Sequence, residues 1–345
     1  MTKGHTEDDH PHDHPVGSRR GALSRRRRLS GHTHDHDAGP VLDTGRAGLR
    51  AAQVSLFGLG ITALAQAIIV AFTGSVALLS DTLHNLTDAA TSIPLWIAFA
   101  VGRRTPTTRF TFGMNRAEDL AGVVIVAAIA LSAAGAVWQS IGRLLEPSEL
   151  DHIPWVFGAG VVGGLGNELV ARYRMRVGRR IGSAALVADG QHARADALTS
   201  LAVVAAGVGA WLGADWIDPV AGLLVATMIL VMLRRAAGRV FGRLMDAVDP
   251  ELVASCDAAA RSVDGVVDVR DLRLRWHGHR LLAMLTVAVD AGLTVGDGHR
   301  IAQEVAHAIL HEVPHAAEAF VHVDPADDDH AHALTEHHRG PPQHD

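Results

Sequence analysis

Apolar residues gather into six segments along the N-terminal and central parts of the chain, separated by shorter polar stretches. The segments cover roughly residues 49–73, 77–101, 116–142, 153–171, 185–211 and 217–233. A helix crosses the hydrocarbon core of a bilayer with about 20 mainly apolar residues, and each segment approaches that length. The pattern predicts a transmembrane domain of six helices over residues 46–240.

Arginines fall in alternate connections between these segments. They precede the first segment and follow the second, fourth and sixth, whereas the other connections are nearly free of basic residues. Because basic residues concentrate on the cytoplasmic side of membrane proteins, both termini are predicted to be cytosolic. The arginines that set the pattern are Arg46, Arg50, Arg103, Arg104, Arg109, Arg116, Arg172, Arg174, Arg176, Arg179, Arg180, Arg234, Arg235 and Arg239.

After about residue 245 the pattern changes to short amphipathic helices and alternating strands. The predicted order is a helix, two strands joined by a turn at Gly278, a second helix and a third strand. These elements cover Pro250–Val263, Val266–Trp276, Leu281–Val289, Val295–His311 and Ala319–Val323. The order predicts a small cytosolic α+β domain over residues 241–326, with the α-β-β-α-β arrangement of ferredoxin-like folds.

The composition fits a membrane domain joined to water-soluble segments. The chain of 345 residues is 48% hydrophobic, with a mean hydropathy of +0.17 and a net charge of −6. Cys256 is the only cysteine, which excludes an intrachain disulfide framework and a cysteine-based zinc finger. The 22 histidines crowd toward the two ends. Residues 1–45 and 327–345 hold too little apolar surface to fold, so we expect disordered, His-rich cytosolic tails.

One pattern of eighteen residues occurs twice, as SVALLSDTLHNLTDAATS (75–92) and SAALVADGQHARADALTS (183–200), with nine positions identical. Each copy lies in an apolar segment and carries Asp, His and Asp at positions i, i+3 and i+7. Residues at that spacing share one face of a helix. Ionisable residues are costly inside a membrane and mark functional sites by default. The two triplets are Asp81, His84 and Asp88, and Asp189, His192 and Asp196.

The two faces together supply a ligand set for a metal ion. His84, Asp88, His192 and Asp196 offer two nitrogens and two oxygens, a set that Zn²⁺ binds tetrahedrally. Co²⁺, Ni²⁺ and Fe²⁺ also fit, whereas Mg²⁺ and Ca²⁺ prefer shells of oxygen alone. A lone buried histidine would favour a simple hydrogen bond between helices, but two matched faces favour a metal site.

Three further polar residues accompany these faces. Asp81 and Asp189 lie a turn away from the ligands on the same face, and we assign them to supporting the ligands or admitting the ion. Arg194 lies on another face of its helix, so we expect it to pair with a residue on a neighbouring helix.

These motifs resemble those of the cation diffusion facilitator family, whose members are proton-coupled exporters of divalent metals. SDTLHNLTD and ADGQHARAD match the metal motifs of the family's second and fifth helices. FTFGMNRAEDL (110–120) matches the start of its third helix, and LMDAVDPELV (244–253) matches its bridge to the cytosolic domain. The resemblance covers about residues 46–326.

The resemblance implies a metal/proton antiporter that works by alternating access, as a homodimer with a transport site in each protomer. The His-Asp/His-Asp pair is similar to that of zinc-preferring members, with Co²⁺, Ni²⁺, Cd²⁺ or Fe²⁺ as alternatives. It also implies a multi-pass protein of the bacterial plasma membrane, whose partners are the metal ion, protons and the bilayer, with no nucleic acid. Zn²⁺ is expected as the substrate and as a candidate regulator rather than as a cofactor.

Two other metal positions of the family are altered in this chain. Thr107, Phe110 and Met114 occupy the loop where some members bind a second metal, so we predict no metal there. The cytosolic domain retains His299, His322 and Asp324 of a further site, but Arg270 and Thr286 stand where that site would have histidines. The turn WHGH offers His277 and His279 as substitutes, and the alternative for them is a solvated hairpin.

The resemblance also places an ionic contact between the two domains. Arg116, at the start of the third helix, matches a basic family position, and Asp246, after the sixth helix, matches an acidic one. In the family these positions interlock near the dimer axis. The alternative is a pair of unrelated surface charges, worth about 0–1 kcal/mol.

Two other classes of function compete with transport. The segment HEVPH (311–315) matches the H-E-x-x-H pattern of zinc peptidases. That pattern works only when both histidines share a helix face, and Pro314 breaks a helix. A passive metal sensor or storage protein would not need a ligand set between membrane helices. We therefore expect a transporter and not an enzyme.

Overall fold

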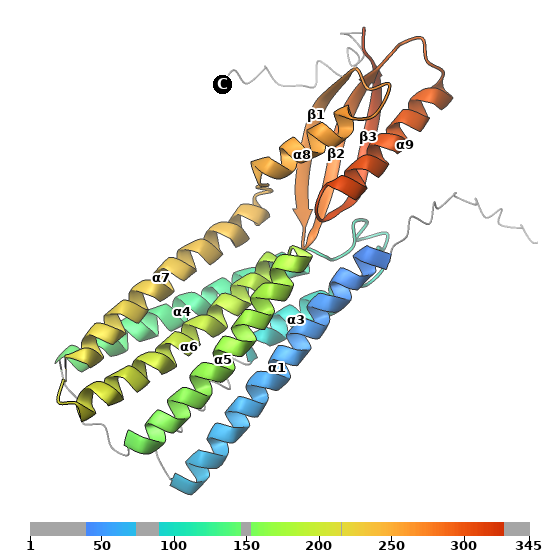
Figure 1. The fold of residues 1–345 in the computed structure, drawn as a ribbon. Helices are drawn as coiled ribbons and strands as arrows, with labels where there is room; N and C mark the ends of the chain where they lie inside the picture. The colour runs from blue at the N-terminus through green and yellow to red at the C-terminus, as the bar shows by residue number, and fades with distance from the viewer. Residues whose placement is uncertain (1–38, 74–89, 146–152, 215, 328–345) are drawn as a thin grey trace, which may run out of the picture. The chain divides into compact units, whose positions relative to one another are not determined.

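A computed structural model describes residues 39–73, 90–145, 153–214 and 216–327 (Figure 1). Its first part is helical, and its second part combines helices with a three-stranded sheet. The first part comprises α1 (Gly39–Thr73), α3 (Ser92–Gly102), α4 (Ala117–Leu145), α5 (Ile153–Ile181), α6 (Ala184–Trp211) and α7 (Ile217–Leu244). The second part comprises α8 (Pro250–Arg261), β1 (Asp268–His277), β2 (Arg280–Val289), α9 (Val295–Glu312) and β3 (Ala316–Pro325).

The predicted fold class, a helical membrane domain followed by a small α+β domain, is confirmed. Every predicted apolar segment lies on a helix as far as the described residues extend, and the small domain has the predicted α-β-β-α-β order. Most of the second predicted segment falls within residues 74–89, outside the described residues. α1 begins at Gly39, inside the stretch 1–45 for which the sequence favours a disordered tail.

Three stretches of the described helices are long and apolar enough to cross a membrane, namely Thr44–Ile68, Ala117–Gly135 and Val220–Leu244. α5 and α6 contain 29 and 28 residues. At a rise of about 1.5 Å per residue, each helix is also longer than the core of a bilayer is thick. Their composition is less apolar because each carries several charged residues. Some of these charged residues form ion pairs between the two helices, so their side chains need not face water.

α5 is longer than the sequence predicts. The fourth apolar segment ends near residue 171, and the sequence places the arginines beyond it in a cytosolic connection, but the helix continues to Ile181. The exposed side of this extension carries Arg172, Arg176, Arg179 and Arg180. Arg174 is buried instead, with 1% of its surface exposed. Hydropathy alone predicts the end of the helix too early, because a helix can continue past a membrane surface with its arginines in solvent.

α5 and α6 lie side by side as a tight antiparallel pair (Figure 1). A connection of two residues joins them, and Gly182 takes the left-handed backbone, with φ at +76°, that commonly ends a helix. A Cβ atom on Gly190 would lie 2.7 Å from Met175 Cγ and 3.0 Å from the carbonyl oxygen of Ala171. The absence of a side chain at Gly190 therefore lets α6 approach α5 one residue after Asp189.

The apolar core of the helical part lies between α3, α4, α6 and α7. Phe99 is its largest buried member, and Leu95, Ile125, Ile129, Leu186 and Ile229 are also buried there. Large apolar side chains on the outer faces remain exposed, among them Phe57, Leu131 and Leu223. Outward-facing apolar residues of this kind suit helices that face lipid or a second protein subunit.

The small domain is built on a sheet with strand order β1-β2-β3. β1 pairs with β2 antiparallel, and β3 pairs with β2 parallel. A parallel pair needs a crossover connection, which α9 supplies. The domain core includes Trp276, Leu281, Val287, Val305 and Ile309.

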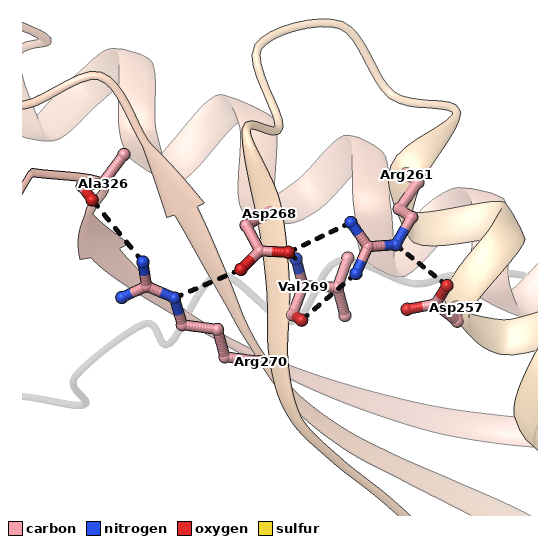
Figure 2. Close-up of polar contacts among 6 residues, drawn as sticks. All are labelled: Asp257, Arg261, Asp268, Val269, Arg270 and Ala326. Carbon is pink, nitrogen blue, oxygen red and sulfur yellow. Dashed lines mark hydrogen bonds and ion pairs between the residues drawn. The ribbon is translucent and has the colours of Figure 1, made fainter.

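Ion pairs fix the start of β1 against α8, and a hydrogen bond fixes it against the residue that follows β3 (Figure 2). Arg261 lies 2.9 Å from a carboxylate oxygen of Asp257 and 3.0 Å from one of Asp268. Arg270 contacts Asp268 at 3.4 Å and donates to the carbonyl of Ala326 at 3.5 Å. The hydrogen bond from Arg261 lowers the pKa of Asp268.

Candidate metal site

The second of the two repeated faces lies buried on α6. Asp189, His192 and Asp196 expose 0%, 1% and 5% of their surfaces. Nδ1 of His192 lies 3.9 Å from Oδ2 of Asp196, one turn further along the helix. As their spacing predicts, these three side chains share one face of the helix, and that face is buried. An imidazole and a carboxylate at this spacing can bind one metal ion from one helix.

Asp81, His84 and Asp88 lie outside the described residues. Within the part of the chain that the structure describes, no group of three or more His, Cys, Asp or Glu residues is arranged to hold a metal. The complete ligand set of His84, Asp88, His192 and Asp196 thus stays a prediction.

Asp189 has a partner that the sequence did not reveal. Nη1 of Arg174 lies 3.1 Å from its Oδ2, and the side chains expose only 1% and 0%. The other terminal nitrogen of Arg174 donates to the hydroxyl of Ser92 at the start of α3. The available signal was helical spacing, because Arg174 lies beside Ala171 and Met175, which are buried against α6. A buried pair that loses one partner is typically destabilised by about 3–5 kcal/mol.

Arg194 was predicted to pair with an unidentified residue on a neighbouring helix, and in the structure it pairs with Glu168. Its Nε and Nη2 donate to the two carboxylate oxygens of Glu168 on α5, at 3.1 and 2.9 Å. Arg172, one turn further along α5, contacts the same carboxylate at 2.7 Å. This bidentate contact is a second ionic link between α5 and α6, and it is partly exposed.

His277 is the last residue of β1 and His279 lies in the turn that leads to β2, and both are buried. Nδ1 of His279 lies 2.8 Å from Oε2 of Glu118 on α4, and the backbone N–H of Gly278 donates to Asp119 at 3.3 Å. Burial, assisted by Arg116, lowers the pKa of His277 to about 4. The alternative of a solvated hairpin is therefore wrong, because this turn packs on the N-terminus of α4.

The structure brings together only part of the other candidate set in the small domain. Nε2 of His322 lies 3.0 Å from Oδ1 of Asp324, and His299 is exposed in the first turns of α9. Arg270, Thr286 and His322 form one row across the sheet. The guanidinium of Arg270 thus lies in the row where the resembling family places a histidine.

The two residues predicted to interlock the domains contact each other within one chain. Nη2 of Arg116 lies 2.7 Å from Oδ1 of Asp246, with side chains 36% and 45% exposed. Arg275 of β1 approaches the other oxygen of Asp246 at 3.4 Å. A role of this contact in dimer formation stays a prediction.

The HEVPH segment does not form a peptidase motif. α9 ends at Glu312, and His315 follows in the left-handed region with φ at +66°. The ring of His315 packs against Trp276, with centroids 5.9 Å apart. The two histidines of the pattern are therefore not on one helix face.

Comparison with protein families and with known proteins points to one kind of function. A model of the cation efflux transmembrane domain matches residues 52–245, and a model of the cation efflux protein cytoplasmic domain matches residues 248–326. The chain is 49% identical over 298 residues to a probable cation efflux system protein of Mycobacterium tuberculosis, covering 85% of this chain and 90% of that protein.

More distant relatives carry names that refer to different settings. The magnetosome protein MamB of Magnetospirillum gryphiswaldense is 27% identical over 265 residues, which cover 76% of this chain and 89% of MamB. The manganese efflux system protein MneP of Bacillus subtilis is 25% identical over 259 residues, which cover 73% of this chain and 87% of MneP.

Proposed function

Because the chain belongs to the cation diffusion facilitator family of cation efflux transporters, we propose that it exports Zn²⁺ in exchange for protons. It is an integral membrane transporter and not an enzyme. The observation that carries the proposal is the pair of matching Asp-His-Asp faces, of which the one on α6 is buried. His84, Asp88, His192 and Asp196 are the proposed ligands, and Asp81 and Asp189 are proposed to support them or to admit the ion.

The donor set favours zinc over harder ions. Two imidazoles and two carboxylates suit the borderline character of Zn²⁺, and the two negative charges balance the charge of the ion. The relative MneP is named for manganese efflux, but Mn²⁺ prefers oxygen ligands, so the two histidines support zinc in this chain. Co²⁺, Ni²⁺, Cd²⁺ and Fe²⁺ are the alternative substrates.

The same ligands supply the exchange of protons. Imidazole titrates near pH 6.5 and binds a metal only when it is neutral, so loading of the ion releases protons from the site. Release of the metal on the other side lets protons return to His84 and His192. Alternation of the site between the two sides then couples the two flows.

The arginine pattern and the family support a proposal for the oligomeric state, the membrane and the orientation of the transporter. We propose a homodimer in the bacterial plasma membrane, with both termini in the cytosol. The small domain is the candidate place for regulation by Zn²⁺, through His322 and Asp324 with His299, or through His277 and His279. The burial of His279 against Glu118 supports a packing role for the turn more than a metal-binding one.

Transport by purified full-length protein in proteoliposomes tests the site. Asp196→Asn and Asp88→Asn are each expected to abolish zinc uptake, because each removes one charged ligand, while the protein still elutes as a folded dimer. Asp264→Asn, an exposed position in the small domain, is the matched control and is expected to transport normally. Full zinc transport by both ligand variants would contradict the site.

Proton coupling needs its own measurement in the same vesicles. A pH-sensitive dye on the opposite side of the membrane is expected to report proton flow that rises with zinc transport. Zinc transport that carries no proton flow and does not respond to a pH gradient would contradict antiport while leaving the metal site in place.

A further inference from the structure

The guanidinium of Arg174 is buried where α3, α5 and α6 meet. Its Nη1 contacts Oδ2 of Asp189 at 3.1 Å and lies 3.4 Å from the carbonyl oxygen of the same residue. Its Nη2 donates to the hydroxyl of Ser92. With 1% of the Arg174 surface exposed, this cation depends on protein partners for its stability.

These partners belong to the two copies of the repeated pattern. Asp189 lies three residues before His192 on α6, so its Cβ is about 5–6 Å from that of the histidine. Ser92 is the last residue of the first copy, four residues after Asp88. Arg174 thus connects the two segments that carry the proposed ligands, although it belongs to neither.

The charge on Arg174 changes what Asp189 can do. A carboxylate without a partner, one turn from a metal ligand, would add an oxygen donor and a negative charge to the site. Such a donor strengthens binding of dications, most of all of ions that prefer oxygen, and slows their release. A guanidinium without its carboxylate would instead repel an arriving dication in a medium of low dielectric.

We propose that Arg174 is a positioning residue of the transport site, which holds the Asp189 carboxylate away from the metal and cancels its charge. The metal is then bound by the His-Asp pairs alone, tightly enough to load and loosely enough to leave. This inference rests on the proposed transport site and goes beyond it, because it assigns the balance between loading and release to a residue outside the ligand set.

The test compares Arg174→Gln, Asp189→Asn, the double variant of the two, and Arg174→Lys. Zinc transport is measured against zinc concentration in proteoliposomes, with Mn²⁺ as a competitor, and zinc binding is measured by calorimetry in detergent. Arg176→Gln is the matched control, since this arginine lies two residues further along the same helix and is exposed.

The single variants are expected to shift KM in opposite directions. Arg174→Gln is expected to lower the KM for zinc and kcat together, with better competition by Mn²⁺. Asp189→Asn is expected to raise the KM about tenfold, equivalent to about 1.4 kcal/mol. The double variant removes both charges and Arg174→Lys keeps both, so the pair stays neutral in each and KM is expected to be near the wild-type value. The control Arg176→Gln is expected to keep the wild-type KM. A purely structural role lowers kcat and the yield of folded protein without opposite shifts in KM.

A lower kcat in both single variants at unchanged KM would overturn the inference. If the single variants do not fold, the double variant and Arg174→Lys decide, and a tenfold change of KM in either contradicts charge balance. Asp196→Asn in the same vesicles separates the two proposals. If it transports zinc, the proposed site fails; if it does not, while Arg174→Gln and Asp189→Asn both keep the wild-type KM, the present inference alone fails.

Discussion

At the residue scale, three polar side chains of α6 lie buried on one face, and Arg174 of α5 contacts the first of them. The i, i+3, i+7 spacing was enough to predict that Asp189, His192 and Asp196 share a face, and their burial agrees with it. The spacing did not reveal Arg174, because an arginine near the end of an apolar segment usually lies in solvent. Only packing against α6 distinguishes Arg174 from the exposed arginines beside it.

Exchange of one ligand type is expected to change the choice of metal. His84→Asp replaces a borderline-soft nitrogen by a carboxylate, which can bind through one or two oxygens and so adapts to a larger ion. We expect Cd²⁺ to be transported more readily relative to Zn²⁺. Competition transport with the two ions in proteoliposomes measures the ratio, and an unchanged ratio would remove His84 as the residue that selects the metal.

The buried turn of the small domain predicts a dependence of stability on pH. The pKa of His277 is about 4 in the folded protein and 6.5 in the unfolded chain, because burial disfavours its charged form. Between these values the unfolded chain binds a proton that the folded protein does not. The free energy of unfolding is therefore expected to be highest above pH 6.5 and to fall as the pH drops toward 4, by at most about 3 kcal/mol.

Unfolding of the full-length protein in detergent across this pH range measures the effect. His277→Phe keeps the ring contact with Phe112 and removes the titrating group, so its stability is expected to depend less on pH. Part of the dependence remains, because burial also lowers the pKa of His315. His299→Gln, at an exposed position, is the control. A wild-type slope in the His277 variant would contradict this account.

At the element scale, periodicity predicted which elements form, but contacts between elements decide where some of them end. The alternation from Val266 onward predicted β1 and β2 with their turn at Gly278, since strand period and turn residues are local signals. The end of α5 was missed because its last turns are amphipathic rather than apolar. The docking of the β1–β2 turn on Glu118 was missed because it joins residues 161 positions apart, which no local pattern encodes.

The close approach of α5 and α6 predicts the effect of a single methyl group. In Gly190→Ala the new Cβ would meet Met175 Cγ and the Ala171 carbonyl, so the helices must separate. Overpacking of this kind typically costs about 1–3 kcal/mol, and it would displace His192, two residues away. We expect lower thermal stability and slower zinc transport.

A second glycine of the same helix provides the control for this change. A Cβ on Gly207 meets nothing within 4 Å. Gly207→Ala is therefore expected to be neutral or to stabilise α6 by up to about 1 kcal/mol, since alanine favours a helix over glycine. Equal effects of the two substitutions would show that helix propensity, and not the contact between α5 and α6, sets the result.

At the scale of the whole molecule, the helical membrane domain and the small domain are joined by side chains as well as by the chain itself. Glu118 and Asp119 at the start of α4 contact the turn that holds His279. Arg116, just before α4, contacts Asp246 just after α7. The N-terminus of α4 is thus linked both to the small domain and to the connection that leads into it.

Reversal of charge at this junction tests whether it interlocks the dimer. Asp246→Arg places a third arginine beside Arg116 and Arg275, so repulsion replaces two attractive contacts. An exposed ion pair of unrelated charges contributes only about 0–1 kcal/mol, and its loss would leave dimer and transport almost unchanged.

If the contact is the interlock, the single variant is expected to dissociate at higher protein concentration and to transport zinc more slowly. Adding Arg116→Asp is expected to restore part of both properties, as measured by light scattering in detergent and by zinc transport in proteoliposomes, with Asp290→Arg as an exposed control. A double variant no better than Asp246→Arg alone would mean that the two residues are independent surface charges.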